Sequence, residues 1–301
     1  MFGGVHQRRH RAGKKQDVDP WVLAMGMQLL SQISQLERKP PVTLALMAVN
    51  VAAWLGMLPL AELGGGWEPM LCPAAIVAGI RPYTHLLLSA FVHASDGGYH
   101  LVYNMASLLW KGVTLELEMG SERFAAMVAA LLLLSHGMYV PLSYLATSLF
   151  GAATFHGCAV GFSAVLFGLK VVINHSQVGQ QAVSFWGIPF PVHAKYAAWV
   201  ELVLISLVAP DASFVGHLCG ILAGIIWLHA SGLAKACLSS GGRPAVGRPQ
   251  QPFRHWGSGT LGAGRPSTAA RPTASGAAGT SWGRDEEAEL REALRRSRMD
   301  F

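Results

Sequence analysis

Charged residues are scarce in this chain of 301 residues. Lys, Arg, Asp and Glu make up 13% of the sequence, whereas an average soluble domain carries about 25%. Hydrophobic residues account for 51%, and they gather in several long segments. A deficit of charge spread over several apolar segments is typical of a polytopic membrane protein, so the expected fold class is an all-α membrane bundle.

Several metal and redox motifs are missing. The four cysteines have no CxxC spacing, which argues against a zinc knuckle or a redox pair; Cys72 and Cys158 could face one oxidising compartment, and the sequence leaves their pairing open. The HExxH motif of zinc proteases is absent. His85, His93 and His100 fit no standard zinc spacing, so we expect no metal site and no cofactor.

The positive charge does not indicate a nucleic-acid-binding protein. The formal net charge is +6, but the basic residues lie in two tails, and no basic helix is interleaved with stacking aromatics. An aspartyl membrane protease needs two aspartates within spans, and Asp211 lies at a loop without such a partner. The basic start of the chain is not followed by a clean apolar core with a cleavage site, so no cleavable signal peptide is expected.

Six apolar segments are long enough to predict a six-transmembrane-helix bundle. They lie near residues 41–60, 99–117, 124–149, 159–174, 195–209 and 213–230. Residues 21–37 are interrupted by Gln28, Ser31, Gln32 and Gln35, so we expect an amphipathic helix in the membrane interface; a degraded extra span is the alternative. The long apolar loop 61–98 is expected to embed at the membrane edge.

Basic residues predict the orientation of these spans. Seven Lys or Arg residues precede the first span and eleven follow residue 230, whereas loop 61–98 contains only Arg81. Because cytosolic segments carry the excess of Lys and Arg, both termini are expected in the cytosol and loop 61–98 on the outer side. The second, fourth and sixth spans then all begin on the outer side.

Four polar residues fall within the first turns of these three spans. His100 and Asn104 are four residues apart, and therefore share a helix face, in the second span; Ser163 opens the fourth, and His217 lies in the sixth. A serine beside an imidazole is a nucleophile with its general base. His100, Asn104 and the backbone N–H of Ser163 are candidate donors to the oxyanion. Taken singly, each residue could serve helix packing alone.

Glycines predict that the fourth and sixth spans approach closely. Gly216, Gly220 and Gly224 repeat every four residues, which lets two helix backbones meet, and Gly161 offers a thin surface on the fourth span. Such contact would bring a serine and a histidine of these spans within hydrogen-bond reach.

The order and spacing of three motifs resemble those of rhomboid intramembrane serine proteases. The motifs are HxxxN from His100, GFSAVLF from Gly161 and GHLCGILAG from Gly216, and the similarity covers roughly residues 41–230. The resemblance implies a catalytic dyad of Ser163 and His217 without a third acid, with His100 and Asn104 stabilising the oxyanion. One departure lies in the first loop, where many rhomboids carry Trp-Arg and this chain has Arg81-Pro-Tyr-Thr.

Further stretches narrow the resemblance to one subgroup of rhomboids. PPVTLALMAVN, NMASLLWKG, AVGFSAVLFGLKV, WVELV and SFVGHLCGILAG are similar to that subgroup. It implies the endoplasmic reticulum membrane and a role in membrane-protein quality control. The expected function is cleavage of membrane proteins in or near their transmembrane segments. The alternative is a non-catalytic rhomboid-like binder that delivers ubiquitinated membrane proteins for degradation.

The C-terminal tail predicts a linker and a short binding helix. Residues 231–283 are rich in Gly, Pro, Ser, Ala and Arg and are expected to be a disordered linker. Residues 284–301 contain DEEAELREALRRS, which resembles a ubiquitin-interacting motif. The positions carried over are Glu286, Glu287, Leu290, Ala293, Leu294 and Ser297. The subgroup also implies an unfolding ATPase of the AAA type as partner, although no separate arginine-rich segment for it is present.

The expected domain organisation has four parts. Residues 1–40 form a cytosolic basic tail with the interfacial helix, and residues 41–230 form the six-span protease domain. The linker and the ubiquitin-interacting helix follow.

Overall fold

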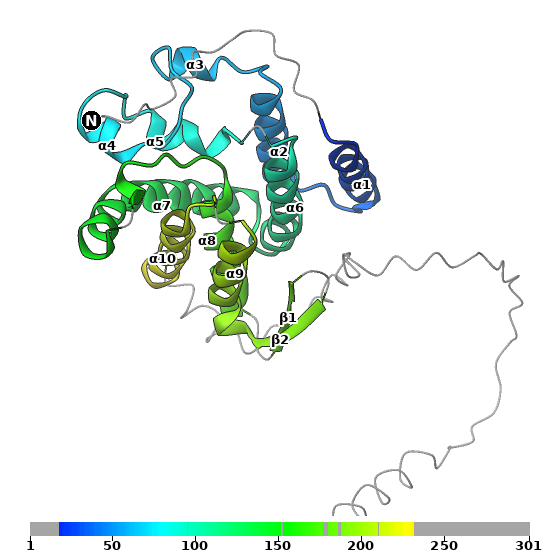
Figure 1. Cartoon of the computed structure of the whole chain (residues 1–301). Helices are drawn as coiled ribbons and strands as arrows, with labels where there is room; N and C mark the ends of the chain where they lie inside the picture. The colour runs from blue at the N-terminus through cyan, green and yellow to red at the C-terminus, as the bar shows by residue number, and fades with distance from the viewer. Residues whose placement is uncertain are drawn as a thin grey trace, which may run out of the picture. The chain divides into compact units, whose positions relative to one another are not determined.

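Helices dominate the part of the chain that the computed structural model describes (Figure 1). That part comprises residues 18–94, 96–151, 153–176, 180–185, 188–209 and 211–231. The six main helices are α2 (Pro41–Trp54), α6 (Tyr99–Met119), α7 (Ser121–Phe150), α8 (Ser163–Ser176), α9 (Ala194–Val208) and α10 (Phe214–Ala230). Each lies within or close to one of the six predicted apolar segments, and the prediction of a mostly helical chain is confirmed.

Helix α7 is the one described helix that is both long and apolar enough to cross a membrane unaided. Helices α2 and α10 are apolar but shorter. The number of membrane crossings therefore stays a prediction.

Helix α1 (Pro20–Gln35) precedes these six helices. Shorter elements connect them, namely α3 (Leu60–Leu63), α4 (Pro73–Val77), α5 (His85–Leu88), η1 (Ser89–Phe91), η2 (Ala153–Phe155), β1 (Gln180–Phe185) and β2 (Ile188–His193). The two strands pair antiparallel, with Phe185 opposite Ile188, and form a hairpin between α8 and α9. The hairpin differs from the all-α prediction. Two six-residue runs separated by two residues are a pattern that favours a hairpin.

Helix α8 lies at the centre of the bundle, where α6, α7, α9 and α10 all pack on it (Figure 1). Ten of its 14 residues are buried, and all of these except Lys170 and Asn174 are apolar, as expected of a helix covered on most faces. Helices α6, α8 and α10 begin at the same end of the bundle. We call this end the serine end, because Ser163 is the first residue of α8.

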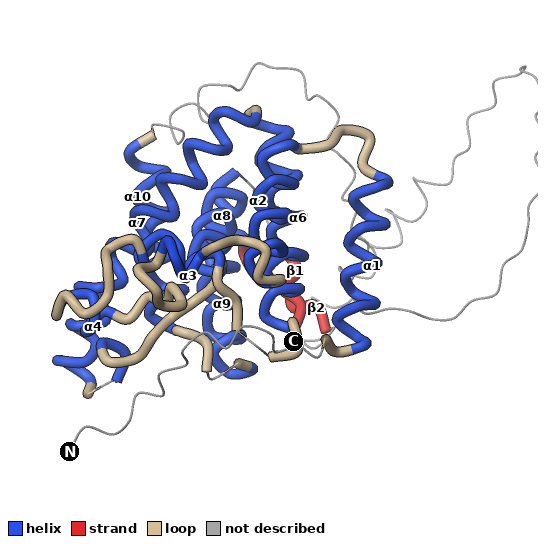
Figure 2. Tube along the Cα trace, turned by 90° about the horizontal axis from the view of Figure 1, so that it is seen from above, coloured by secondary structure: helices blue, strands red, loops and turns tan. Residues whose placement is uncertain are grey.

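Helix α1 lies beside α6 at the edge of the bundle (Figure 2). Its buried residues Val22, Met25 and Leu29 recur every three to four positions and form one stripe. The predicted helix is therefore present. It packs along α6, and its place in the membrane interface stays a prediction.

Loop 61–98 is fastened to the segment that leads into α8. Leu71 and Ala159 exchange two backbone hydrogen bonds, each with a nitrogen–oxygen distance of 2.9 Å. The neighbouring Cys72 and Cys158 form a disulfide, which answers the pairing question left open by the sequence.

Two side chains anchor the loop internally. The Arg81 guanidinium lies over the Trp67 ring, 5.4 Å from its centre, so the arginine pairs with a tryptophan distant in sequence. The fully buried His85 ring lies between the carbonyl oxygens of Gly64 and Met70, at 3.0 and 3.1 Å from its nitrogens.

Candidate active site

Helices α8 and α10 meet backbone to backbone. A Cβ atom on Gly220 would overlap the carbonyl oxygen of Ala164, and one on Gly224 would lie 2.8 Å from the carbonyl oxygen of Gly168. Real Cβ contacts are not that short, so only glycine allows this approach at the two positions. The glycines therefore set the distance between the two helices.

The third glycine of the predicted ladder has a different role. A Cβ atom on Gly216 would lie 3.2 Å from the Ser213 hydroxyl oxygen, and the next contact is the Tyr139 ring on α7. Gly216 therefore faces the cap of its own helix and α7, so the prediction that it packs on the fourth span is wrong. The ladder turns away from α8 in the first turn of α10.

Ser163 and His217 lie in direct contact across this interface. His217 Nε2 lies 2.9 Å from Ser163 Oγ, as the glycine spacing predicts. Phe167, one turn after Ser163 on α8, stacks on the imidazole, with ring centres 4.6 Å apart and planes inclined by 28°. With the ring proton on Nδ1, the serine hydroxyl donates to Nε2, which is the arrangement of a nucleophile with its general base.

The histidine has no third group behind it in the described part of the chain. His217 Nδ1 is buried and has no hydrogen-bond partner there. The contact is thus a dyad, and the ring is oriented by Phe167 and by the glycine-packed helices rather than by a carboxylate.

His100 lies against Gly161, in the segment that leads into Ser163. The Ala94 N–H donates to His100 Nδ1 at 3.3 Å, so in the neutral ring the proton sits on Nε2. A Cβ atom on Gly161 would lie only 2.8 Å from that Nε2, and Gly161 has a φ of +108°. Gly161 therefore makes room for a ring N–H donor two residues before Ser163. Its nearest contacts are with His100 on α6, so the prediction that it faces the sixth span is wrong.

Asn104 follows one turn later on α6, as the spacing predicts. Its side-chain Nδ2 donates to the His100 carbonyl oxygen at 2.7 Å, and its Oδ1 is buried without a partner among the described residues. An amide nitrogen carries two hydrogens, so one remains for a further acceptor. The structure brings His100 and Asn104 together on one face of α6.

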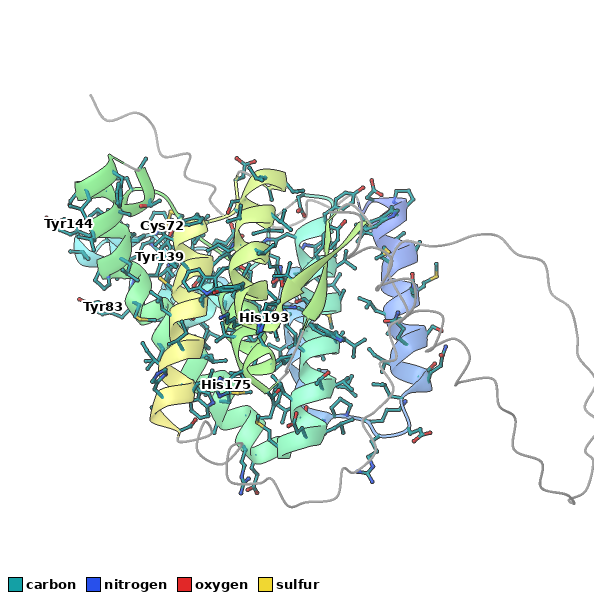
Figure 3. The ribbon with its side chains drawn as sticks, turned by 90° about the horizontal axis from the view of Figure 1, so that it is seen from below. Cys72, Tyr83, Tyr139, Tyr144, His175 and His193 are labelled. Carbon is teal, nitrogen blue, oxygen red and sulfur yellow. A yellow bond between two sulfur atoms is a disulfide. The ribbon has the colours of Figure 1, made fainter. Side chains whose placement is uncertain are left out.

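A cap on α10 also escaped sequence analysis. The Ser213 hydroxyl accepts from the Gly216 N–H at 3.1 Å and donates to the Tyr139 hydroxyl at 3.2 Å. Tyr139, which Figure 3 labels on α7, packs in the same cluster as Leu71. A serine directly before an apolar run is a helix-start signal, so the cap could have been predicted, whereas its tyrosine partner could not.

His93 is a second histidine beside His100. The two rings contact edge to face with centres 5.1 Å apart, and both nitrogens of the buried His93 ring lack partners in the described ranges. Burial, and then the charge of His100, lower the pKa of His93 to about 3. His93 therefore stays neutral and packs behind the candidate oxyanion donor.

A charged cluster joins α6, α8 and α9 farther from the serine end. Glu201 Oε1 lies 3.6 Å from Lys111 Nζ, and Glu201 Oε2 lies 3.7 Å from Lys170 Nζ. The lysine side chains are 3% and 8% exposed and the Glu201 side chain is 34% exposed, so two buried lysines share a partly exposed carboxylate in one ion pair network. Lys170 also lies over the Trp110 ring, 5.0 Å from its centre. Sequence analysis missed the cluster, because its members come from three separate helices.

The predicted ubiquitin-interacting helix lies outside the described residues, and so does the linker after residue 231. The assignments of Glu286, Glu287, Leu290, Ala293, Leu294 and Ser297 therefore stay predictions.

Comparison with known proteins identifies the family. The rhomboid domain matches residues 81–232, a range that contains His100, Asn104, Ser163 and His217. Rhomboid-related protein 4 of Homo sapiens is 38% identical over 242 residues, which cover 78% of this chain and 72% of that protein. The Mus musculus protein of the same name is 42% identical over 205 residues, 66% of this chain and 61% of that protein.

A plant relative has a similar degree of identity. Rhomboid-like protein 14, mitochondrial, of Arabidopsis thaliana is 40% identical over 210 residues, 69% of this chain and 61% of that protein. The chain belongs to the rhomboid family and is an integral membrane protein. The resemblance read from the motifs is confirmed, since the two mammalian relatives are rhomboid-related protein 4. This chain spans 61% of the length of the mouse and plant relatives.

Proposed function

We propose that this rhomboid protein is an intramembrane serine protease that cleaves membrane proteins in or near their transmembrane segments. The observation that carries the proposal is the distance of 2.9 Å between Ser163 Oγ and His217 Nε2. It supports catalysis because the glycines bring the two helices close enough for this contact, and the Phe167 ring stacks on the imidazole that makes it. A serine that served only helix packing would require no ring stacked against its partner.

The proposed reaction proceeds through an acyl-enzyme. Ser163 Oγ attacks the scissile carbonyl carbon while His217 Nε2 takes the hydroxyl proton. The oxyanion accepts hydrogen bonds from the His100 Nε2–H and the free Asn104 N–H, which stabilise the charge as it forms. The intermediate collapses, the C–N bond breaks, and His217 returns the proton to the leaving amine.

Deacylation repeats these steps with water. A water molecule attacks the ester carbonyl, His217 takes one of its protons, and the C–O bond to Ser163 breaks as the serine regains a proton. Water must reach the Ser163 hydroxyl for this step, and Ser163 is only partly buried in the isolated chain.

For the membrane we propose that α2 and α6 to α10 make six crossings, with the serine end on the outer side. The disulfide of Cys72 and Cys158 at that end supports an oxidising compartment there. The C-terminal tail then lies in the cytosol, where the helix in residues 284–301 would capture ubiquitinated clients. We place this activity in membrane-protein quality control at the endoplasmic reticulum, with an unfolding ATPase as a further partner.

Client cleavage in cells tests the protease proposal. Ser163→Ala and His217→Ala should each abolish the client fragment seen with the wild type. Ser206→Ala is the matched control, since the Ser206 hydroxyl donates to a carbonyl oxygen of its own helix at 2.7 Å. Equal fragment from the wild type and from both dyad variants would refute the protease and favour the non-catalytic binder. Client turnover that survives Ser163→Ala would do the same.

A further inference from the structure

We infer that helix α1 is a positioning element for the oxyanion residue His100. Its first turn docks on the residues between Asp96 and His100 and holds the start of α6 in place. The inference rests on the proposed function, because it assigns α1 a role in the same reaction.

Helix α1 runs along α6 from the serine end to the opposite end. At its start, the Asp19 N–H donates to the Gly97 carbonyl oxygen at 3.2 Å, directly before α6. The next helix, α2, begins at the far end of α6, where the Val42 N–H donates to a Glu116 carboxylate oxygen at 2.9 Å. Sixteen residues of α-helix span about 24 Å, so α1 covers most of the length between these points.

The first turn of α1 leaves no free space against α6. A Cβ atom on Gly98 would lie 2.9 Å from Val22 Cγ1 and 3.2 Å from the Trp54 ring. Gly98 also has a φ of +98°, which L-residues with a side chain rarely adopt. Gly98, the N-cap residue of α6, is therefore packed tightly between α1 and the end of α2.

Aromatic rings extend this contact along the first turn of α6. The Trp21 ring stacks on Tyr99, with centres 5.4 Å apart and planes inclined by 21°. The same tryptophan contacts Tyr103 at 5.8 Å. Tyr99 directly precedes His100, so Trp21 packs against the residue next to the candidate donor.

The segment that α1 contacts, residues 97–99, also positions His100. The Asp96 carboxylate accepts from the Gly98 N–H at 3.1 Å and from the His100 N–H at 2.8 Å. A shift of residues 97–99 would move His100 Nε2 relative to Gly161. The dyad lies on α8 and α10 and would keep its own contact, so the effect should fall on oxyanion stabilisation.

The opposite face of α1 has no such role. Leu23, Met27 and Leu30 are exposed by 55%, 66% and 67%. In a membrane protein these side chains suit contact with lipid. Leu23 therefore supplies a control on the same turn as Trp21.

A disulfide tests the docking without any measure of activity. A Cβ atom on Gly97 would lie 3.6 Å from the Asp19 Cβ, within the 3.5–4.5 Å range of disulfides. Asp19→Cys combined with Gly97→Cys should form a cross-link in membranes under mild oxidation, and neither single variant should. Gly97 has a φ of +76°, so the Gly97→Cys single variant is first checked for the unfolding temperature of the wild type. Failure of the pair to cross-link in protein that passes this check would overturn the inference.

Kinetics test the positioning role. Trp21→Ala should lower kcat by roughly tenfold with little change in KM, a smaller loss than the 10²–10³-fold typical of deleting a donor. Leu23→Ala should leave kcat unchanged. In a His100→Ala background, Trp21→Ala should have no further effect, because its action passes through that residue.

Three results would count against the inference. An unchanged kcat in Trp21→Ala, a loss that adds fully to that of His100→Ala, or a change confined to KM would each contradict it. Wild-type protein that cleaves nothing would instead refute the proposed function, and the positioning role with it. The two failures are therefore distinguished by the activity of the wild type.

Discussion

Helices α9 and α10 both pack on α8, and they are attached to it by different means. Helix α10 approaches through Gly220 and Gly224, so backbone meets backbone along the contact. Helix α9 presents the buried side chains Ala194, Ala197, Ala198 and Leu202, and between them Glu201 reaches two lysines.

Helix α9 also leaves more of its side chains exposed than α10 does. Much of α9 is uncovered in the isolated chain, where Val203 and Leu207 are 54% and 69% exposed. Helix α10 carries His217 and is buried on most faces. Close backbone packing thus holds the helix that keeps the 2.9 Å contact, whereas the helix beside it combines apolar packing with an ion pair network. A shape contact fails when volume is added, whereas a charge contact fails when one partner is removed.

The largest expected loss of stability comes from removing the Glu201 charge that attaches α9 to its neighbours. Glu201→Gln leaves Lys111 and Lys170 buried without a counter-ion and should destabilise the protein by about 3–5 kcal/mol. Unfolding in detergent measures the loss. Glu118→Gln, at an exposed position on α6, is the control for removing one charge.

A triple variant sharpens that test. Replacing the whole cluster with Lys111→Met, Glu201→Leu and Lys170→Met should restore stability close to that of the wild type, because no charge is left unpaired. A triple variant as unstable as Glu201→Gln would show that the cluster does not act as an ion pair network.

The disulfide fastens the segment before α8 to loop 61–98. Cys72→Ser opens a link between residues 86 positions apart, which should lower the stability by about 2–4 kcal/mol. Thermal unfolding with and without dithiothreitol measures it. Reductant should bring the wild type to the level of the variant and leave the variant unchanged, and a wild type indifferent to reductant would speak against the bond.

Added volume tests the attachment of α10. Gly220→Ala places a methyl group against the Ala164 carbonyl and should cost about 1–3 kcal/mol, with loss of proteolysis as the dyad separates. Gly137→Ala is the matched control, since a Cβ atom there meets nothing within 4 Å. Equal stability and activity of the two variants would contradict a close backbone contact at Gly220.

The smallest expected effect is the change in stability over the first pH unit below 6.5. The pKa of His93 is lowered by burial from an ordinary 6.5 to about 3 in the folded protein, so only the unfolded chain takes up this proton between these values. Stability should therefore fall as the pH drops from 6.5 toward 3, by at most about 1.4 kcal/mol per pH unit from this group. His93→Gln should flatten that part of the curve, and an identical curve would contradict the neutral, buried ring.

Much of the serine end could be predicted from sequence, because its signals are local. His100 and Asn104 share a face through their spacing, and the repeat of Gly220 and Gly224 implies a close helix pair. The role of Phe167 was harder to predict. It lies one turn after Ser163 on the same helix, but an aromatic residue there is equally typical of a hydrophobic core.

Other features depend on residues far apart in the chain. The cluster around Glu201 joins three helices, and no spacing within one helix announces it. Helix α1 was predictable as a helix. Its contact with Gly97 and Gly98 was not, because it joins residues more than 70 positions apart and depends on how the chain folds between them. Gly216 was misplaced because a repeat of glycines gives a stripe without saying where the neighbouring helix ends.

Covalent labelling of Ser163 tests the central claim most directly. Wild-type protein treated with a fluorophosphonate probe in membranes should carry a single adduct on Ser163, found by peptide mass spectrometry. Labelling should vanish in Ser163→Ala and in His217→Ala, since the hydroxyl is activated by the imidazole 2.9 Å away. An unlabelled wild type that remains folded, or labelling undiminished in His217→Ala, would contradict a catalytic dyad at this site.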